Sequence, residues 1–324
     1  MSAAQSDISK LIEALIANIR GLHETIEHLS DQLRGLVYKV DKENASNINR
    51  KSGTYWRLVA YLNSLIRIRL FLEQNFNYIE PMGILAVTRY LFELTVWLRL
   101  MHKNENYGCV YYLELVNTQL KYYHDLQGHL TREVTFLKET DVHEKKLFKQ
   151  RFKEAEKITD METRQQALQQ LSNDITQVID TQASRRFSIY SEQAQSNGYA
   201  CQADLVETKT LPNIEKSISD LELERNQFEG DATEDVRNLV RDFKGNKIKW
   251  NWKQKAIDVG MEDDYNFIYS YTSRLLHAFP VSVATNHKNL ELDEIRIFLK
   301  YIHIRLLDII EITENLLLSS SSSD

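Results

Sequence analysis

The sequence predicts an all-α fold, a multi-helix bundle, because it has few residues that interrupt helices. Only 10 glycines and 3 prolines occur among 324 residues, 13 together, where average usage would give about 39. The hydrophobic fraction of 43% and the charged fraction of 27% are typical of a globular protein. A third observation is a long run of apolar residues at helical spacing near the N-terminus. Together they exclude wholesale disorder and argue against β-sandwiches, barrels and Gly-rich nucleotide folds.

The N-terminal segment has the spacing of a coiled-coil seam. The seam residues are Ile8, Ile12, Leu15, Ile19, Leu22, Ile26, Leu29, Leu33, Leu36 and Val40. Steps of 4 and 3 residues alternate along them without a break, so we expect one long helix. Its partner is either a second copy or another protein, which would make an oligomer, or a later helix of the same chain.

The remaining elements follow from composition and from the glycine, proline and polar segments that end helices. We expect helices at 54–78, 83–103, 109–126, 212–230, 231–243 and 263–279, and long polar helices within 130–196. The domain boundaries then follow as an N-terminal helix (1–48), a core in two halves (49–128 and 245–318), a polar helical arm (129–244) and a flexible tail (319–324). The arm is expected because apolar positions are sparse in it.

Charge and cysteine usage limit the classes of function. The net charge of −6 argues against binding nucleic acid through bulk charge. Cys109 and Cys201 are far apart and belong to no metal motif, so we expect no disulfide framework, metal or cofactor. Arg89 and Glu93 interrupt the most apolar stretch, 83–98, so we expect no membrane span. The start of the chain does not read as a secretion signal, so we expect a cytoplasmic protein.

The helix at 83–99 has apolar residues on every side, which is typical of a buried helix. Arg89 and Glu93 would then point inward, one turn apart. The basic residue comes first, which is the less favourable order for stabilising a helix. Two interpretations stay open: a structural buried polar network, or a functional cleft.

The helix at 263–279 carries a narrow polar stripe. Asn266, Ser270, Ser273 and His277 follow one another at steps of 4, 3 and 4 residues. A serine beside a histidine suits acid–base chemistry or phosphate recognition, although His277 alone could equally be a core histidine. Because inward polar groups need partners, we expect Arg89 or Glu93 within hydrogen-bonding or one-water distance of Ser273 or His277.

Basic and aromatic residues alternate in the segment 241–255. Such a pattern can hold a phosphate backbone and stack bases. The candidate nucleic-acid-binding residues are Lys244, Lys247, Lys249, Trp250, Trp252 and Lys253. The alternative is a surface loop whose tryptophans fill the core.

Two motifs of the core resemble a widespread family of uncharacterised helical bacterial proteins. One is the Arg-x3-Glu of Arg89 and Glu93. The other consists of Trp252, Ala256, Gly260, Tyr265, Tyr269, Ser273 and His277. The resemblance covers the core and leaves the N-terminal helix and the arm outside. The helical build and the Arg/His chemistry are more remotely similar to HEPN-type ribonucleases of bacterial defence and toxin systems.

We expect a polar pocket in the core built from Arg89, Glu93, Tyr269, Ser273 and His277. If this set is catalytic, metal-independent RNA cleavage is the most reasonable chemistry, by analogy with those ribonucleases. His277 would be the acid–base, Arg89 would stabilise the phosphorane charge, and Glu93 would orient Arg89. Two alternatives remain: a non-enzymatic scaffold assembled by its coiled coil, and a sensor of a small phosphorylated ligand. A sealed pocket would favour the scaffold, and an open cleft would favour nucleic acid.

Overall fold

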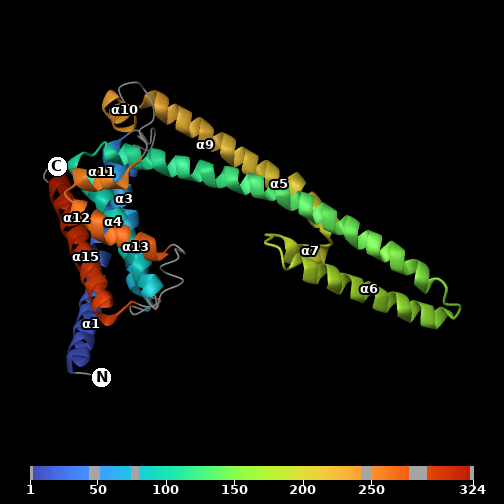
Figure 1. Cartoon of the computed structure of the whole chain (residues 1–324). Coiled ribbons are helices and arrows are strands. Elements are labelled where there is room, and N and C mark those ends of the chain that lie inside the picture. The colour runs from blue at the N-terminus through green and yellow to red at the C-terminus, as the bar shows by residue number, and fades with distance from the viewer. Residues whose placement is uncertain (1–2, 44–51, 74–79, 242–249, 277–289, 322–324) are drawn as a thin grey trace. The chain divides into compact units, whose positions relative to one another are not determined.

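The computed structural model describes residues 3–43, 52–73, 80–241, 250–276 and 290–321, and confirms the predicted all-α fold. No β-strand occurs within these ranges. Two compact units divide the chain: unit 1 comprises residues 1–114 and 228–324, and unit 2 comprises 115–227. Two helices, α5 (Tyr107–Ala155) and α9 (Leu211–Asp231), run from one unit into the other (Figure 1).

Unit 1 forms the core that positions the candidate site. Its helices are α1 (Ala3–Gly21), α2 (His23–Glu43), α3 (Gly53–Glu73), α4 (Pro81–Lys103), α10 (Glu234–Val240), α11 (Trp252–Asp258), α12 (Glu262–Asp264), the π-helix η2 (Tyr265–Tyr269), α13 (Ser270–Leu276) and α15 (Leu292–Ser321). One apolar cluster joins residues of α1 to α4 with residues of α11 and α15. Tyr61 and Phe92 are among its largest fully buried side chains. Within the part of the chain that is described, no helix is long and apolar enough to span a bilayer.

The predicted N-terminal seam packs against the chain's own core. All ten seam residues are buried in the apolar cluster of unit 1 or packed against it. Helix α1 packs on α15, and α2 packs on α3. The expectation of one long helix was wrong, because a turn at Leu22 separates α1 from α2. Both halves of the seam pack on helices of the same chain, and α15 contacts both α1 and α2, which supports the intramolecular alternative.

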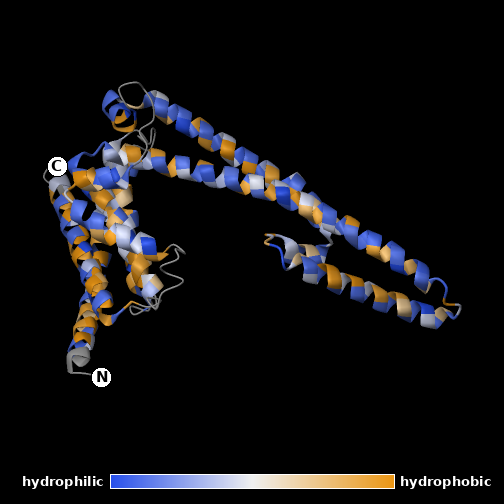
Figure 2. Cartoon of the chain, in the orientation of Figure 1, coloured by the Kyte–Doolittle hydropathy of each residue, from blue (hydrophilic) through white to orange (hydrophobic). Residues whose placement is uncertain are grey.

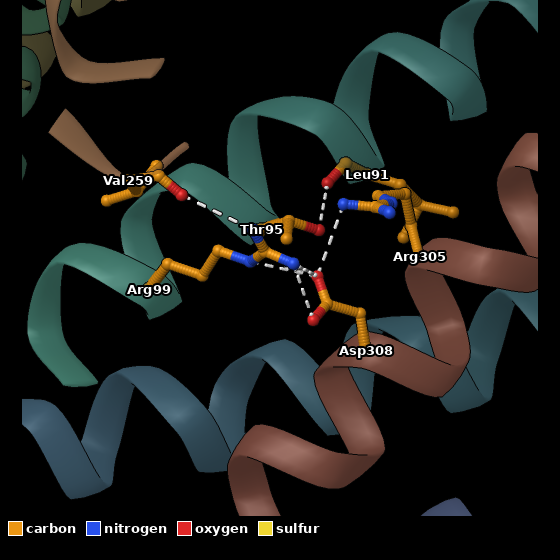
Figure 3. Close-up of polar contacts among 6 residues, drawn as sticks. All are labelled: Leu91, Thr95, Arg99, Val259, Arg305 and Asp308. Carbon is orange, nitrogen blue, oxygen red and sulfur yellow. Dashed lines mark hydrogen bonds and ion pairs between the residues drawn. The ribbon is translucent and has the colours of Figure 1, made fainter. Parts of the chain in front are cut away.

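An ion pair connects α4 to α15 inside unit 1 (Figure 3). The Arg99 guanidinium donates to both carboxylate oxygens of Asp308, at 2.7 and 2.8 Å, and to the carbonyl of Val259 at 3.3 Å. Arg305 approaches the same carboxylate at 3.3 Å. Asp308 is only 14% exposed, so these contacts replace the water that it loses on folding. The group fixes the turn after α11 against both helices.

Unit 2 contains the middle of the chain. Its own helices are α6 (Met161–Ala183), α7 (Ser191–Asn197), α8 (Tyr199–Leu205) and the π-helix η1 (Val206–Thr210). Polar residues dominate the colouring of α5, α6 and α9 in Figure 2, as expected for this segment. Lys138 approaches Glu207 at 2.6 Å and Gln127 approaches Glu215 at 3.3 Å, so α5 and the η1–α9 segment run antiparallel.

The predicted helix break between 126 and 130 does not occur. Helix α5 continues through Gly128 instead. A glycine inside a helix destabilises it by about 1 kcal/mol relative to alanine. Here Leu126, Leu130 and Val134 pack with Val206 in a small apolar cluster on the same stretch of α5. These tertiary contacts hold the helix together where local propensity alone suggests an end.

Candidate functional site

Helix α4 carries the first half of the candidate site. Pro81 occupies its first turn, and the Glu80 side chain accepts a hydrogen bond from the Met82 amide at 3.1 Å. The prediction that this helix is buried on every side was wrong. Met82, Ala86 and Tyr90, at steps of one turn, form an exposed stripe. Alanine is small and tyrosine has a polar hydroxyl, so both tolerate solvent despite their apolar classification.

Arg89, Glu93 and Tyr269 form a hydrogen-bonded cluster. The Arg89 Nε donates to Glu93 Oε1 at 3.0 Å, and an Arg89 terminal nitrogen donates to the Tyr269 hydroxyl at 3.2 Å. The guanidinium also lies over the Tyr269 ring, 4.8 Å from its centroid. The side chains of Arg89 and Glu93 are 28% and 29% exposed, so the pair is half-buried rather than sealed in the core.

Tyr269 is held by other aromatic rings as well as by Arg89. Its ring stacks on Tyr265 at 5.0 Å and packs against Phe92 at 5.2 Å. Burial raises the pKa of Tyr269, while the neighbouring Arg89 charge opposes that rise. Tyr269 therefore stays a neutral phenol at pH 7, able to accept from Arg89 and still donate its own proton.

The predicted helix at 263–279 contains a π-helical segment, η2, which changes the expected polar stripe. The Ser270 hydroxyl donates to the Tyr265 carbonyl five residues earlier, at 3.1 Å. A π-turn shifts the side chains that follow it relative to those that precede it. Asn266 is exposed, whereas the Ser273 hydroxyl is buried. The two residues therefore do not share one face, and the single-stripe expectation was wrong.

Ser273 is the one serine of that stripe whose hydroxyl is buried without a hydrogen-bond partner in the described part of the chain. We expected Arg89 or Glu93 to bond to Ser273 or His277, but the hydrogen bond from Arg89 goes to Tyr269, four residues before Ser273. His277 lies outside the described residues. Helices α4 and α13 pack on each other, so Ser273 belongs to a helix in contact with the one that carries Arg89.

The tryptophans of the basic segment pack on the core. Trp250 stacks on Trp97 with ring centroids 4.0 Å apart, and Trp252 contacts Trp250 edge-to-face at 5.5 Å. One face of the Trp250 ring is thus covered by Trp97. Lys253 is exposed. Lys244, Lys247 and Lys249 lie outside the described residues, so phosphate binding by this segment stays a prediction.

A pocket of about 240 Å³ lies beside the cluster, in unit 1. Its walls are formed by Asn63, Ser64 and Arg67 of α3, Tyr90, Glu93, Leu94 and Trp97 of α4, Tyr111 of α5 and Trp252 of α11. Asn63, Arg67 and Tyr90 are exposed, so the pocket opens to solvent. Glu93 belongs both to the pocket wall and to the ion pair with Arg89.

Sequence reasoning missed most of this pocket. Arg67 and Asn63 are spaced one turn apart on α3, but Arg57 and Arg69 also interrupt that helix. The pair therefore does not stand out in the sequence as Arg89 and Glu93 do on α4. Tyr111 gave no such signal, because it lies in a tyrosine-rich segment where no position stands out. No group of three or more His, Cys, Asp or Glu side chains suited to a metal comes together within the described ranges.

An all-α core with a half-buried Arg–Glu–Tyr cluster beside an aromatic pocket defines a helical protein with a polar site. Residues 57–295 match the model of a family of unknown function (DUF5677), so the chain belongs to that family. The matched range includes the polar arm, which the resemblance seen in the sequence left outside. No curated protein and no solved structure matches the chain significantly.

Proposed function

We propose that this protein cleaves RNA without a metal ion, using the cluster of Arg89, Glu93 and Tyr269 together with Ser273 and His277. The observation that carries the proposal is the double position of Glu93. Its carboxylate fixes the Arg89 guanidinium at 3.0 Å and also lines a solvent-open aromatic pocket. A fixed cation next to an aromatic pocket provides charge stabilisation beside a surface that suits a base.

The proposed reaction is an internal transesterification. The ribose 2′ oxygen attacks the adjacent phosphorus and the bond to the 5′ oxygen breaks, giving a 2′,3′-cyclic phosphate and a free 5′ hydroxyl. His277 takes the proton from the 2′ hydroxyl and returns a proton to the leaving 5′ oxygen. Arg89 stabilises the negative charge on the phosphorane, while Glu93 and Tyr269 hold its guanidinium in place.

The test is cleavage of a mixed RNA by the purified full-length chain, with and without EDTA. We expect cleavage in both conditions, with products that end in a cyclic phosphate. Glu93→Gln should lower the cleavage rate at least about 100-fold. The matched control is Glu73→Gln, because Arg69 and Glu73 form a second Arg-x3-Glu pair, at 3.2 Å, outside the pocket. Equal activity of the two variants, or no cleavage by the wild type, would refute the proposal.

A role in bacterial defence or as a toxin belongs to the same proposal. Induced expression of the wild type should then slow bacterial growth, and Arg89→Ala should restore it. The open pocket favours this enzymatic function over a scaffold whose polar groups only stabilise the core. Growth inhibition that persists unchanged in Arg89→Ala would argue against it.

A further inference from the structure

The pocket beside Glu93 is lined by polar side chains that have no polar partner in the described part of the chain. Asn63, Arg67, Tyr90 and Tyr111 form no side-chain hydrogen bond or ion pair with the described residues, although three different helices bring them together. Most arginines of α3 and α4, by contrast, form ion pairs with carboxylates. Arg69 approaches Glu73 at 3.2 Å, and Arg99 approaches Asp308 at 2.7 Å.

Arg67 supplies a positive charge at the pocket mouth. Partial burial raises the pKa of Tyr90 and of Tyr111, and the charge of Arg67 opposes the rise at both hydroxyls. One guanidinium thus lines the same pocket as two phenols, and no carboxylate among the described residues pairs with it. An unpaired arginine flanked by hydroxyl donors is the arrangement that binds a phosphate group.

The aromatic part of the pocket wall suits a planar base. Trp97, Trp252 and Leu94 line it, and the Tyr111 ring meets Trp97 edge-to-face at 5.3 Å. Such rings bind nucleobases by stacking. The volume of about 240 Å³ is below the roughly 300–1,000 Å³ of most small-ligand sites, so the pocket has room for at most one nucleotide and not for a dinucleotide cofactor.

Glu93 provides the polar group for the base edge. An ionised carboxylate only accepts hydrogen bonds, so it favours bases that present N–H donors side by side. Guanine has two such donors on its Watson–Crick edge. One Glu93 oxygen accepts a hydrogen bond from Arg89. Each carboxylate oxygen has two lone pairs, so both oxygens of this pocket-lining residue can still accept from a base.

We propose that this pocket binds one guanine nucleotide, with its phosphate on Arg67, its base against the aromatic wall and its N–H edge on Glu93. This inference deepens the proposed function, because it names the nucleotide of RNA that the site recognises. The residues that bind the base are then directly linked to the cation that acts on the phosphorus, through the Glu93–Arg89 ion pair.

Calorimetric titration of the full-length chain with GMP, guanosine and ribose 5-phosphate tests the inference. GMP should bind more tightly than either fragment and at least 10-fold more tightly than UMP. Arg67→Gln should weaken the binding of GMP at least 10-fold and leave the binding of guanosine unchanged. Glu93→Gln should weaken the binding of both ligands. Arg69→Gln, on the same helix but outside the pocket, should bind GMP like the wild type.

Arg67 is exposed and has no ion-pair partner where the structure is described, so Arg67→Gln should fold normally, which its melting temperature verifies. No binding of GMP at millimolar concentration, equal binding of UMP, or normal binding by Arg67→Gln would each overturn the inference. The titration needs no cleavage. RNA cleavage can therefore fail while GMP binds, which would refute the proposed function alone, and the reverse result would refute only the inference.

Discussion

Arg89 and Tyr269 are separated by 180 residues in the sequence, yet the guanidinium of one donates to the hydroxyl of the other at 3.2 Å. Each belongs to one of the two motifs noted in the sequence. Their contact brings the Arg-x3-Glu helix and the Tyr-x3-Ser helix to one location in unit 1. The site is therefore formed by tertiary packing of α4 against η2 and α13.

The stability of this cluster can be measured through Glu93→Ala. Full burial would predict a loss of about 3–5 kcal/mol, because Arg89 would be left buried without its partner. The side chains are 28% and 29% exposed, so we expect a loss of only about 1 kcal/mol in the free energy of unfolding. Urea denaturation measures it, with Glu73→Ala as the matched control. A loss above about 3 kcal/mol would show that the pair is desolvated after all.

The sequence predicted the helical class and much of the core but only part of the site. Glycine and proline usage indicates long helices, and the apolar spacing marks the residues that face the core. The break at Leu22 directly follows Gly21, a weak helix former, but one glycine does not by itself predict a break. The π-turn at η2 has no comparable signal in the sequence. The same holds for Tyr111, whose place in the pocket depends on how α5 meets α4.

The ion pair of Arg99 with Asp308 is more buried than the cluster at Arg89. Asp308→Asn preserves the size of the side chain and removes its charge, which leaves Arg99 and Arg305 facing each other. We expect a loss of about 2–3 kcal/mol in stability, measured by urea denaturation. Asp31→Asn is the control, because Asp31 is 59% exposed in its pair with Arg34 and should change stability by less than about 1 kcal/mol. Equal effects of the two substitutions would contradict the structural role of Asp308.

The N-terminal seam can be tested with Ile19→Ala. Ile19 is 0% exposed inside the core of unit 1, so its truncation should lower stability by about 3 kcal/mol. The molar mass from light scattering should not change, because the seam packs within the chain. Leu11→Ala, at a position 53% exposed on the same helix, should have little effect on either quantity. A fall in mass with Ile19→Ala would instead support the intermolecular coiled coil.

Alkaline pH should destabilise the fold. Burial, and then the Glu105 carboxylate, raise the pKa of Cys109 from 9.0 to about 11. Burial and the hydrogen bond to Glu294 raise the pKa of Tyr271 from 10.0 to about 12. The unfolded chain releases these protons first, so the folded state binds more protons between about pH 9 and 12 and loses stability as the pH rises.

Urea midpoints measured from about pH 8 to 11 should therefore fall steadily above pH 9. Below pH 9 both groups are protonated in the folded and the unfolded chain, and this contribution is constant. Tyr271→Phe should reduce the slope above about pH 10. A midpoint that stays level across this range would show that these groups titrate alike in both states.

The closest approach of α3 to α5 depends on Gly108. A Cβ atom at this position would clash with the carbonyl oxygen of Gly53 and lie 2.8 Å from the Arg57 amide nitrogen. These are backbone atoms, so relief requires the two helices to separate. We expect Gly108→Ala to lower stability by about 2 kcal/mol or more, as overpacking does, although alanine is the better helix former.

Gly128→Ala provides the matched comparison on the same helix. Its Cβ would meet only the end of the Arg132 side chain, at 3.6 Å, which is ordinary contact. Here the higher helix propensity of alanine determines the change in stability, so the substitution should raise the free energy of unfolding by about 0.5–1 kcal/mol. Urea denaturation of the two variants should give shifts of opposite sign. A gain in both would mean that α3 and α5 can part without loss, and that their close contact contributes nothing to the stability of unit 1.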